Sequence, residues 1–207
     1  MLTATIKTVE QTMSILLIGG SPAAPSSSGR LLDYVGDKLA LLGHRHSKLQ
    51  VRDLPPTALL HADCSDLAIK RALAAVADAD AIVIATPVYK AAYTGVLKAF
   101  LDLLPQDGLK GKLVLPLATG GSQSHMLALD YALRPVLHAL DARQVLTSVY
   151  AVSQQLIWND TTGLTLDPAI SWRVQAGVDA LSDGLRALSA EVDEVYVPPV
   201  QPVRLAR

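Results

Sequence analysis

Small and hydroxyl-bearing residues crowd one stretch near the start of the sequence. Residues 19–30 read GGSPAAPSSSGR and follow an apolar segment, residues 15–19, that is typical of a buried strand. Glycine lets a ligand approach the backbone, serine hydroxyls donate hydrogen bonds, and the helix expected next begins with free N–H groups. The pattern indicates a phosphate-binding loop, although a Ser/Pro-rich loop with a helix cap has the same composition. It lacks the GxGxxG spacing of dinucleotide-binding folds and the lysine of nucleoside triphosphatases, so neither class is favoured.

Two further stretches carry groups suited to a flat, polar ligand. Residues 86–98 read TPVYKAAYTGVLK and contain Tyr89 and Tyr93, whose rings can wall a pocket for a planar ring. The alternative is that both tyrosines serve packing and that the proline and glycine of this stretch mark turns. Residues 118–124 read ATGGSQS, whose paired glycines expose backbone N–H groups beside another helix start.

Alternating apolar and amphipathic segments predict how these stretches are positioned. Short apolar runs separated by longer amphipathic ones, with no signal for an antiparallel hairpin, are typical of βα units that build a parallel sheet covered on both faces. We expect strands over residues 15–19, 46–51, 81–86, 112–119 and 144–152, and helices over residues 30–42, 65–78, 94–104, 125–140 and 168–188. Ser65 is the expected N-cap of the second helix, and residues 153–165 form a polar connection that holds Trp158.

These units predict an α/β fold with an open, doubly wound, five-stranded parallel sheet of strand order 2-1-3-4-5. In such sheets ligands lie at the carboxyl ends of the strands, near the point where the strand order reverses, here between strands 1 and 3. The three stretches follow strands 1, 3 and 4 at that edge. A phosphate on the first stretch and a planar ring against the other two together describe flavin mononucleotide (FMN).

Composition and charge exclude several classes of protein. The 207 residues are 50% hydrophobic and 18% charged, which suits one folded domain, expected over residues 14–190 between a disordered N-terminal arm, residues 1–13, and an extended C-terminal tail, residues 191–207. Eighteen basic and nineteen acidic residues give a net charge of −1, too little to attract nucleic acid or an anionic membrane. With one cysteine, and neither a signal peptide nor a membrane-spanning segment, a cytoplasmic protein is expected.

Several strings of the sequence resemble one enzyme family. GSPxxPS, ATPVYKAAYTGVLK, LLP, LPLATGG and HMLALDYALRPVLHAL, in this order across residues 14–152, resemble the NAD(P)H-dependent FMN reductases that serve two-component alkanesulfonate monooxygenases. The resemblance implies a flavodoxin-like fold, an oligomer that is usually a homotetramer, and hydride transfer from NADPH to FMN. It also implies that the reduced FMN passes to a partner monooxygenase. Hydride transfer needs two stacked rings and little from protein acids or bases, so no catalytic side chain and no metal ligand are expected.

The resemblance also assigns ligand contacts, residue by residue. Ser21, Ser26, Ser27 and Ser28 would hold the phosphate; Pro87, Val88 and Tyr89 would line the ring and ribityl chain; Thr119, Gly120, Gly121 and Ser122 would contact the isoalloxazine edge. The family commonly carries arginines in its first loop, where this sequence has Ala23 and Ser27. Another group must therefore balance the negative charge of the phosphate. Arg30 is the local candidate, and the alternative is that Arg30 is a solvated residue of the first helical turn.

A proline interrupts the helix expected over residues 125–140. Pro135 lacks an N–H and its ring crowds the carbonyl of Tyr131, so the regular hydrogen-bond ladder must break there. Such breaks often take the form of a π-bulge, and in the resembled family an inserted tyrosine makes a π-helix at the subunit interface. The string DYALRP, residues 130–135, matches that position and predicts an interface π-helix at Tyr131; a simple proline kink with Tyr131 as a packing residue is the alternative.

Two other functions are compatible with the sequence. A quinone, azo-dye or chromate reductase of the same fold would retain FMN and pass the hydride onward. A flavodoxin-type electron carrier would have no enzymatic activity, but such carriers are typically strongly acidic and this chain is nearly neutral. The sequence contains no fingerprint that separates NADPH from NADH as the reductant.

Overall fold

A parallel sheet of six strands forms the centre of the protein. The computed structural model describes residues 13–193. The sheet has the order β2-β1-β3-β4-β5, and β6 also pairs with β4. The strands are β1 (Ser14–Gly19), β2 (Arg45–Gln50), β3 (Ala81–Pro87), β4 (Leu113–Gly120), β5 (Gln144–Val145) and β6 (Val149–Val152). This is the predicted order 2-1-3-4-5, so the doubly wound α/β fold is confirmed.

The last predicted strand is divided into β5 and β6, both of which pair with β4. Arg134, the first residue of α5 (Arg134–Ala139), reaches the interruption. Its guanidinium donates hydrogen bonds to the carbonyls of Val145 and Leu146 at 2.9 and 3.1 Å, and to the Ser148 hydroxyl at 3.3 Å. The backbone carbonyls around the interruption are therefore satisfied by a side chain.

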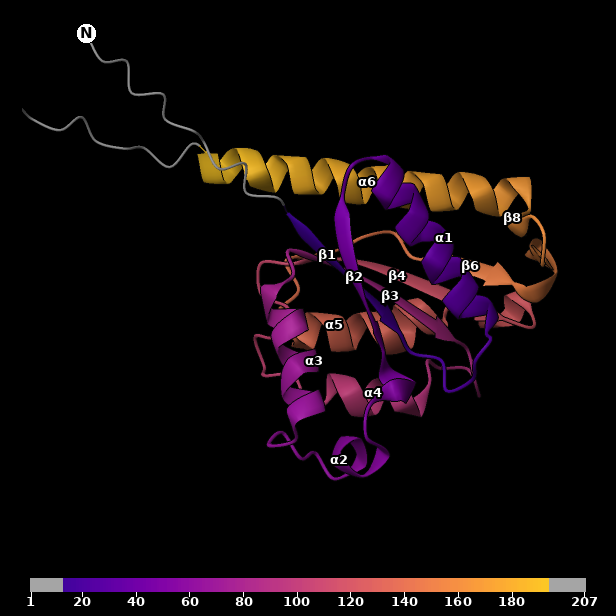
Figure 1. Cartoon of the computed structure of the whole chain (residues 1–207). Coiled ribbons are helices and arrows are strands. Elements are labelled where there is room, and N and C mark those ends of the chain that lie inside the picture. Colours follow the sequence, from indigo (N-terminus) through magenta and orange to yellow (C-terminus); the bar gives the residue numbers. More distant parts are fainter. Residues whose placement is uncertain (1–12, 194–207) are drawn as a thin grey trace, which may run out of the picture.

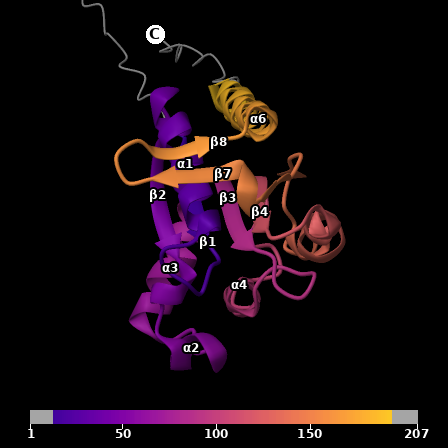
Figure 2. The same ribbon diagram turned by 90° about the vertical axis from the view of Figure 1, so that its right-hand side faces the viewer.

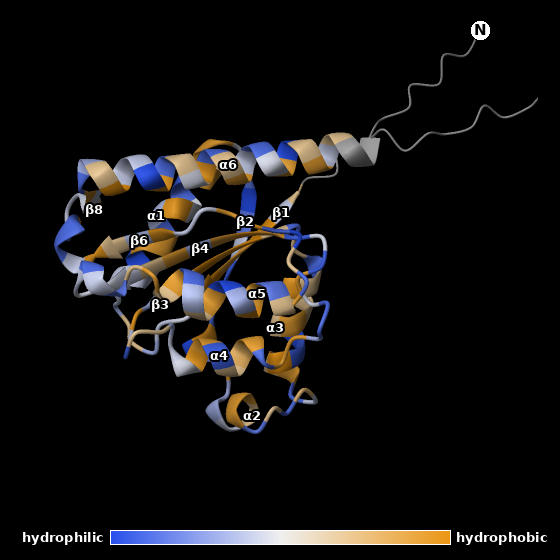
Figure 3. Ribbon diagram, turned by 180° about the vertical axis from the view of Figure 1, so that it is seen from behind, coloured by the Kyte–Doolittle hydropathy of each residue, from blue (hydrophilic) through white to orange (hydrophobic). Residues whose placement is uncertain are grey.

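Helices cover both faces of the sheet (Figure 1). One face packs against α1 (Ser27–Leu41) and α6 (Pro168–Asp193), and the other against α3 (Leu67–Asp78), α4 (Gly95–Leu101) and α5. The short helix α2 (Pro56–Leu60) lies against α4. Coloured by hydropathy, β4 is apolar between these helix layers, whereas the edge strand β2 is hydrophilic (Figure 3). The central strands thus supply apolar side chains to a core on each face.

The cap of α3 differs from the prediction. Asp66, not Ser65, caps the helix, because a carboxylate oxygen of Asp66 accepts hydrogen bonds from two backbone N–H groups of the first turn at 2.7 and 3.1 Å. Ser65 instead donates its hydroxyl hydrogen to the Asp63 carboxylate at 2.6 Å. Both residue types are good caps, so the choice between them depends on the backbone.

Other helix ends also shift. α1 begins at Ser27, earlier than predicted, and α4 ends at Leu101, earlier than predicted. α6 continues to Asp193, so residues 191–193 of the predicted extended tail are helical. The rest of that tail, and residues 1–12 of the predicted arm, lie outside the described residues. None of the helices in the described part of the chain has both the length and the apolar composition that crossing a bilayer requires.

An antiparallel hairpin occupies the segment predicted as a polar connection. β7 (Leu156–Asn159) pairs with β8 (Gly163–Leu166), a hairpin for which the sequence showed no signal. Its turn is closed by Asn159, whose side-chain oxygen accepts hydrogen bonds from the N–H groups of Thr161 and Thr162 at 2.8 and 3.3 Å. The hairpin lies beside α1, outside the main sheet (Figure 2). Because most of its side chains are exposed, it lacks the apolar alternation that would have revealed it.

Candidate functional site

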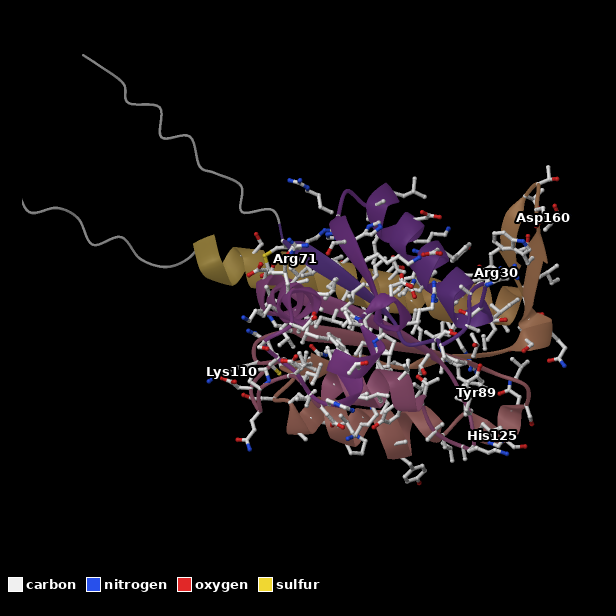
Figure 4. The ribbon with its side chains drawn as sticks, turned by 60° about the horizontal axis from the view of Figure 1, so that its bottom comes forward. Arg30, Arg71, Tyr89, Lys110, His125 and Asp160 are labelled. Carbon is white, nitrogen blue, oxygen red and sulfur yellow. The ribbon has the colours of Figure 1, made fainter. Side chains whose placement is uncertain are left out.

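Three loops meet at one edge of the sheet, as the sequence predicted. They are the β1–α1 loop (residues 20–26), the β3–α4 loop (residues 88–94) and the β4–α5 loop (residues 121–128). The parallel register aligns Gly19 with Ala85 and Pro87 with Thr119, so the carboxyl ends of all three strands face the same way. Figure 4 shows Arg30, Tyr89 and His125 at one end of the molecule, with Arg71 and Lys110 at the opposite end.

The serines predicted to bind the phosphate lie in the β1–α1 loop and at the start of α1. Ser26 is the N-cap, and its hydroxyl accepts a hydrogen bond from the Gly29 N–H at 3.1 Å. The N–H groups of Ser27 and Ser28 lie in the first turn, where helix geometry provides no acceptor. The Ser28 hydroxyl is buried and has no hydrogen-bond partner in the described part of the chain. Ser21, also buried, hydrogen-bonds within the loop, to the backbone two residues on.

Two arginines lie beside this loop, and the sequence indicated only one of them. Arg30 places its guanidinium over the ring of Trp158, 4.2 Å from the ring centre, so it is not a freely solvated first-turn residue. Arg52, in the 3₁₀ turn Val51–Asp53 after β2, donates hydrogen bonds to the Ala23 carbonyl at 3.2 Å and to the Gln50 side chain at 3.0 Å. A hollow of about 100 Å³ beside the loop is lined by both arginines. The position of β2 next to β1 is the signal that could have revealed Arg52.

The β3–α4 loop holds its two tyrosines in different environments. The loop is tied to the neighbouring strand by the Val88 N–H, which donates to the Thr119 carbonyl at 2.8 Å. Tyr89 is half exposed at the start of a tight turn, whereas Tyr93 packs against the core, where burial raises the pKa of its hydroxyl. Tyr89 is therefore the ring available to a ligand, and Tyr93 serves packing.

Thr94 joins the first two loops. Its hydroxyl donates a hydrogen bond to the Gly20 carbonyl, and its N–H donates to the Thr86 hydroxyl at 3.2 Å. Both threonines are buried. Thr94 also caps α4, so one side chain fixes the start of a helix and the spacing of two loops.

The β4–α5 loop is held by a tyrosine that the sequence did not indicate. Thr119 and Gly120 are buried at the end of β4, while Gly121 and Ser122 are exposed. The Tyr150 hydroxyl, on β6, donates to the Ser122 carbonyl at 2.6 Å. Burial raises the pKa of Tyr150, so its hydroxyl remains a proton donor at neutral pH. This bond ties the start of the β4–α5 loop to β6.

The predicted helix break is a π-helix over Leu129–Leu133, directly before α5. Pro135 lies in the first turn of α5, where its missing N–H costs no hydrogen bond. Tyr131 is 79% exposed, so the alternative in which Tyr131 packs within its own subunit is wrong.

No three histidine, cysteine or acidic side chains gather as a metal site would require anywhere in residues 13–193. The candidate site consists instead of backbone N–H groups, hydroxyls, one exposed ring and two arginines. These groups suit the binding of a phosphorylated planar molecule more than acid–base chemistry.

Comparison with known proteins agrees with this geometry. The sequence family described as NADPH-dependent FMN reductase matches residues 13–156. A protein of Escherichia coli (strain K12) named FMN reductase (NADPH) is 46% identical over 145 residues, which cover 70% of this chain and 76% of the relative. The apo form of an NADH:FMN oxidoreductase (EMOB) is 42% identical with a TM-score of 0.76, covering 82% of this chain and 88% of that one. A flavodoxin from the domain Archaea, 11% identical with a TM-score of 0.55 and covering 83% and 98% of the two chains, shares the fold.

Proposed function

The chain belongs to the NADPH-dependent FMN reductase family, and from this premise we propose that it supplies reduced FMN to a partner flavin-dependent alkanesulfonate monooxygenase. It is an oxidoreductase of flavodoxin-like fold that uses FMN and NAD(P)H. In the proposed cycle, NADPH transfers a hydride to FMN, and the reduced FMN leaves the enzyme for its partner.

The start of α1 fits the phosphate of FMN. The observation that carries the proposal is the buried Ser28 hydroxyl, which has no hydrogen-bond partner in the described chain. It lies beside the N–H groups of the first helical turn, which attract anions. Ser21, Ser26 and Ser27 add hydroxyls of the same loop, and Arg30 and Arg52 supply positive charge next to it.

The other two loops fit the isoalloxazine ring. Pro87, Val88 and Tyr89 would line the ring and ribityl chain, and the bond between Val88 and Thr119 holds the two loops at a constant spacing. Thr119, Gly120, Gly121 and Ser122 would contact the ring edge. FMN, when bound, supplies the hydride-accepting ring; the protein positions it and donates hydrogen bonds to it.

Release of FMN is supported by the weak charge of the β1–α1 loop. Residues 20–26 contain no charged side chain, so most of the phosphate contacts are hydroxyls and N–H groups. Charge-assisted hydrogen bonds are roughly twice as strong as neutral ones. A loop of this kind suits a flavin that enters and leaves with each turnover.

We place assembly of a homotetramer at the π-helix. Tyr131 is 79% exposed on this helix. A groove of about 800 Å³ lies between α6 and residues on either side of Tyr131 in the sequence. Trp172 of α6, which is 73% exposed, borders this groove. Exposed aromatic rings beside a groove are typical of subunit contacts.

The function is tested by a steady-state assay with NADPH or NADH and with FMN, FAD or riboflavin, alongside a test for bound flavin. We expect FMN to be the preferred acceptor and the protein to lose its flavin on dialysis. Stoichiometric FMN after extensive dialysis, with quinone preferred to FMN, would identify a flavin-retaining reductase instead. Absence of NAD(P)H oxidation with every acceptor would indicate an electron carrier. Transfer to the partner is measured as oxygenase turnover when the reductase is the only source of reduced FMN.

A further inference from the structure

A groove of about 420 Å³ lies between α1 and the β7–β8 hairpin. Its α1 wall includes Tyr34 and Lys38, and its hairpin wall includes Trp158 and Leu164. Pockets for small molecules start at about 300 Å³, so the groove has room for one nucleoside. Most of the hairpin lies beyond the residues that match the family, which end at 156.

Trp158 is an exposed ring that is nevertheless held in place. Arg30 stacks on the ring at 4.2 Å, and the indole N–H donates a hydrogen bond to the Asp160 carboxylate at 2.9 Å. The ring is 43% exposed. Figure 4 shows Arg30 and Asp160 at the same end of the molecule, on α1 and the hairpin turn. A fixed aromatic ring that the core does not cover is a stacking platform with little conformational entropy left to lose.

The opposite wall carries the other groups that a nucleotide requires. Lys38 lies 5.5 Å from the centre of the Tyr34 ring, so a second ring and a cation face the groove together. Asp33 and Asp37 also line it, and carboxylates accept hydrogen bonds from ribose hydroxyls. A ring for a purine base, a carboxylate for the ribose and cations for a phosphate are the recognition chemistry of an adenosine phosphate.

Arg30 connects this groove to the proposed FMN site. It lines both the groove and the hollow beside the β1–α1 loop. A nucleotide in the groove would therefore lie next to the FMN phosphate, on the same end of the molecule as Tyr89. We propose that the groove binds the adenosine phosphate end of the nicotinamide nucleotide while its nicotinamide reaches the flavin. This inference rests on the proposed function, because the groove has this use only if NAD(P)H reduces FMN bound at the β1–α1 loop.

The test compares Trp158→Ala and Lys38→Ala with the wild type in FMN reduction, and measures binding of adenosine 2′,5′-bisphosphate and 5′-AMP by calorimetry. Because Trp158→Ala removes the ring on which the base would stack, it should raise the KM for NADPH about fivefold or more. The kcat and the KM for FMN should change less than about twofold. Lys38→Ala should raise the KM for NADPH and weaken the binding of adenosine 2′,5′-bisphosphate. Ile157→Ala is the matched control, because this neighbour on β7 is 60% exposed and points to the other face of the strand.

The outcomes separate the inference from the proposed function. Wild-type protein that reduces FMN while both variants keep the wild-type KM for NADPH, and bind the adenosine phosphates equally well, would overturn the groove alone. Wild-type protein that oxidises no NAD(P)H with FMN would overturn the proposed function itself.

Discussion

The Tyr150 hydroxyl occupies the space where a side chain on Gly120 would begin. A Cβ built on Gly120 would lie 2.1 Å from that oxygen and 3.0 Å from the ring carbon that bears it. From this position the hydroxyl donates to the Ser122 carbonyl at 2.6 Å. The absence of a side chain at the end of β4 therefore allows β6 to fix the β4–α5 loop.

Gly120→Ala should displace Tyr150 and release the loop. Overpacking of this kind costs about 1–3 kcal/mol in the free energy of unfolding, and the KM for FMN should rise several-fold because the loop N–H groups lose their position. Denaturant unfolding and steady-state kinetics measure the two effects. Gly121→Ala is the control for stability, since a Cβ there meets no atom within 4 Å.

The double variant Gly120→Ala/Tyr150→Phe tests the cause. Removing the hydroxyl removes the 2.1 Å contact, so the double variant should lose less stability than the sum of the single variants. Additive losses would mean that Gly120 acts independently of Tyr150.

The two arginines beside the β1–α1 loop should affect FMN through its phosphate. We expect Arg30→Ala and Arg52→Ala each to raise the apparent KM for FMN several-fold, because each removes positive charge next to the loop. Riboflavin lacks the phosphate, so its KM should stay near the wild-type value. Arg71→Ala, at the opposite end of the molecule, is the control. An equal rise for FMN and riboflavin would show that the arginines only support the fold.

The parts of the site that could be predicted from the sequence are those encoded in local patterns. The buried strands β1, β3 and β4 are apolar runs, and parallel pairing then brings their loops to one edge whatever the details of packing. Pro135 likewise reveals a helix break by itself. Arg52 and Tyr150 could not be found in this way, because each reaches its loop from a neighbouring strand, across the sheet. The β7–β8 hairpin was missed because most of its side chains are exposed, so its sequence lacks the alternation of apolar and polar residues that marks a half-buried strand.

Two residues of the β3–α4 loop adopt a backbone conformation that favours glycine. Lys90 and Ala91 have φ angles of 51° and 65° in the turn that Tyr89 and Ala92 close by hydrogen bonds at 2.9 and 3.2 Å. This conformation costs an L-residue about 1–2 kcal/mol, and glycine loses about 0.5–1 kcal/mol more entropy on folding. Ala91→Gly should therefore raise the free energy of unfolding by about 0.5–1 kcal/mol.

Urea unfolding measures this gain, and Ala92→Gly is the matched control. Ala92 has no positive φ, so glycine there should only lose stability. A loss with Ala91→Gly as large as with Ala92→Gly would show that the turn is not strained.

His44 makes the stability depend on pH. Its ring lies 2.8 Å from the Ser182 hydroxyl of α6, and burial, followed by the charge of Arg186, lowers its pKa below the ordinary value of 6.5. Between the two pKa values the unfolded chain binds more protons, so this contribution to stability is complete above pH 6.5 and is lost as the pH falls through the folded pKa. Urea midpoints from neutral to mildly acidic pH should fall less in His44→Gln than in the wild type; identical slopes would assign the pH dependence to other groups.

Tyr131 should control assembly rather than the stability of one subunit. Its ring is 79% exposed within a π-helix, so Tyr131→Ala removes no contact from the core, whereas deleting Tyr131 also removes the extra residue of the helix. We expect light scattering to show a tetramer for the wild type, a smaller species for both variants, and wild-type assembly for Tyr131→Phe, which keeps the ring. The KM for FMN should rise in the deletion variant, because the π-helix directly follows the β4–α5 loop. Unchanged mass and unchanged flavin affinity in the deletion variant would remove the π-helix from the interface.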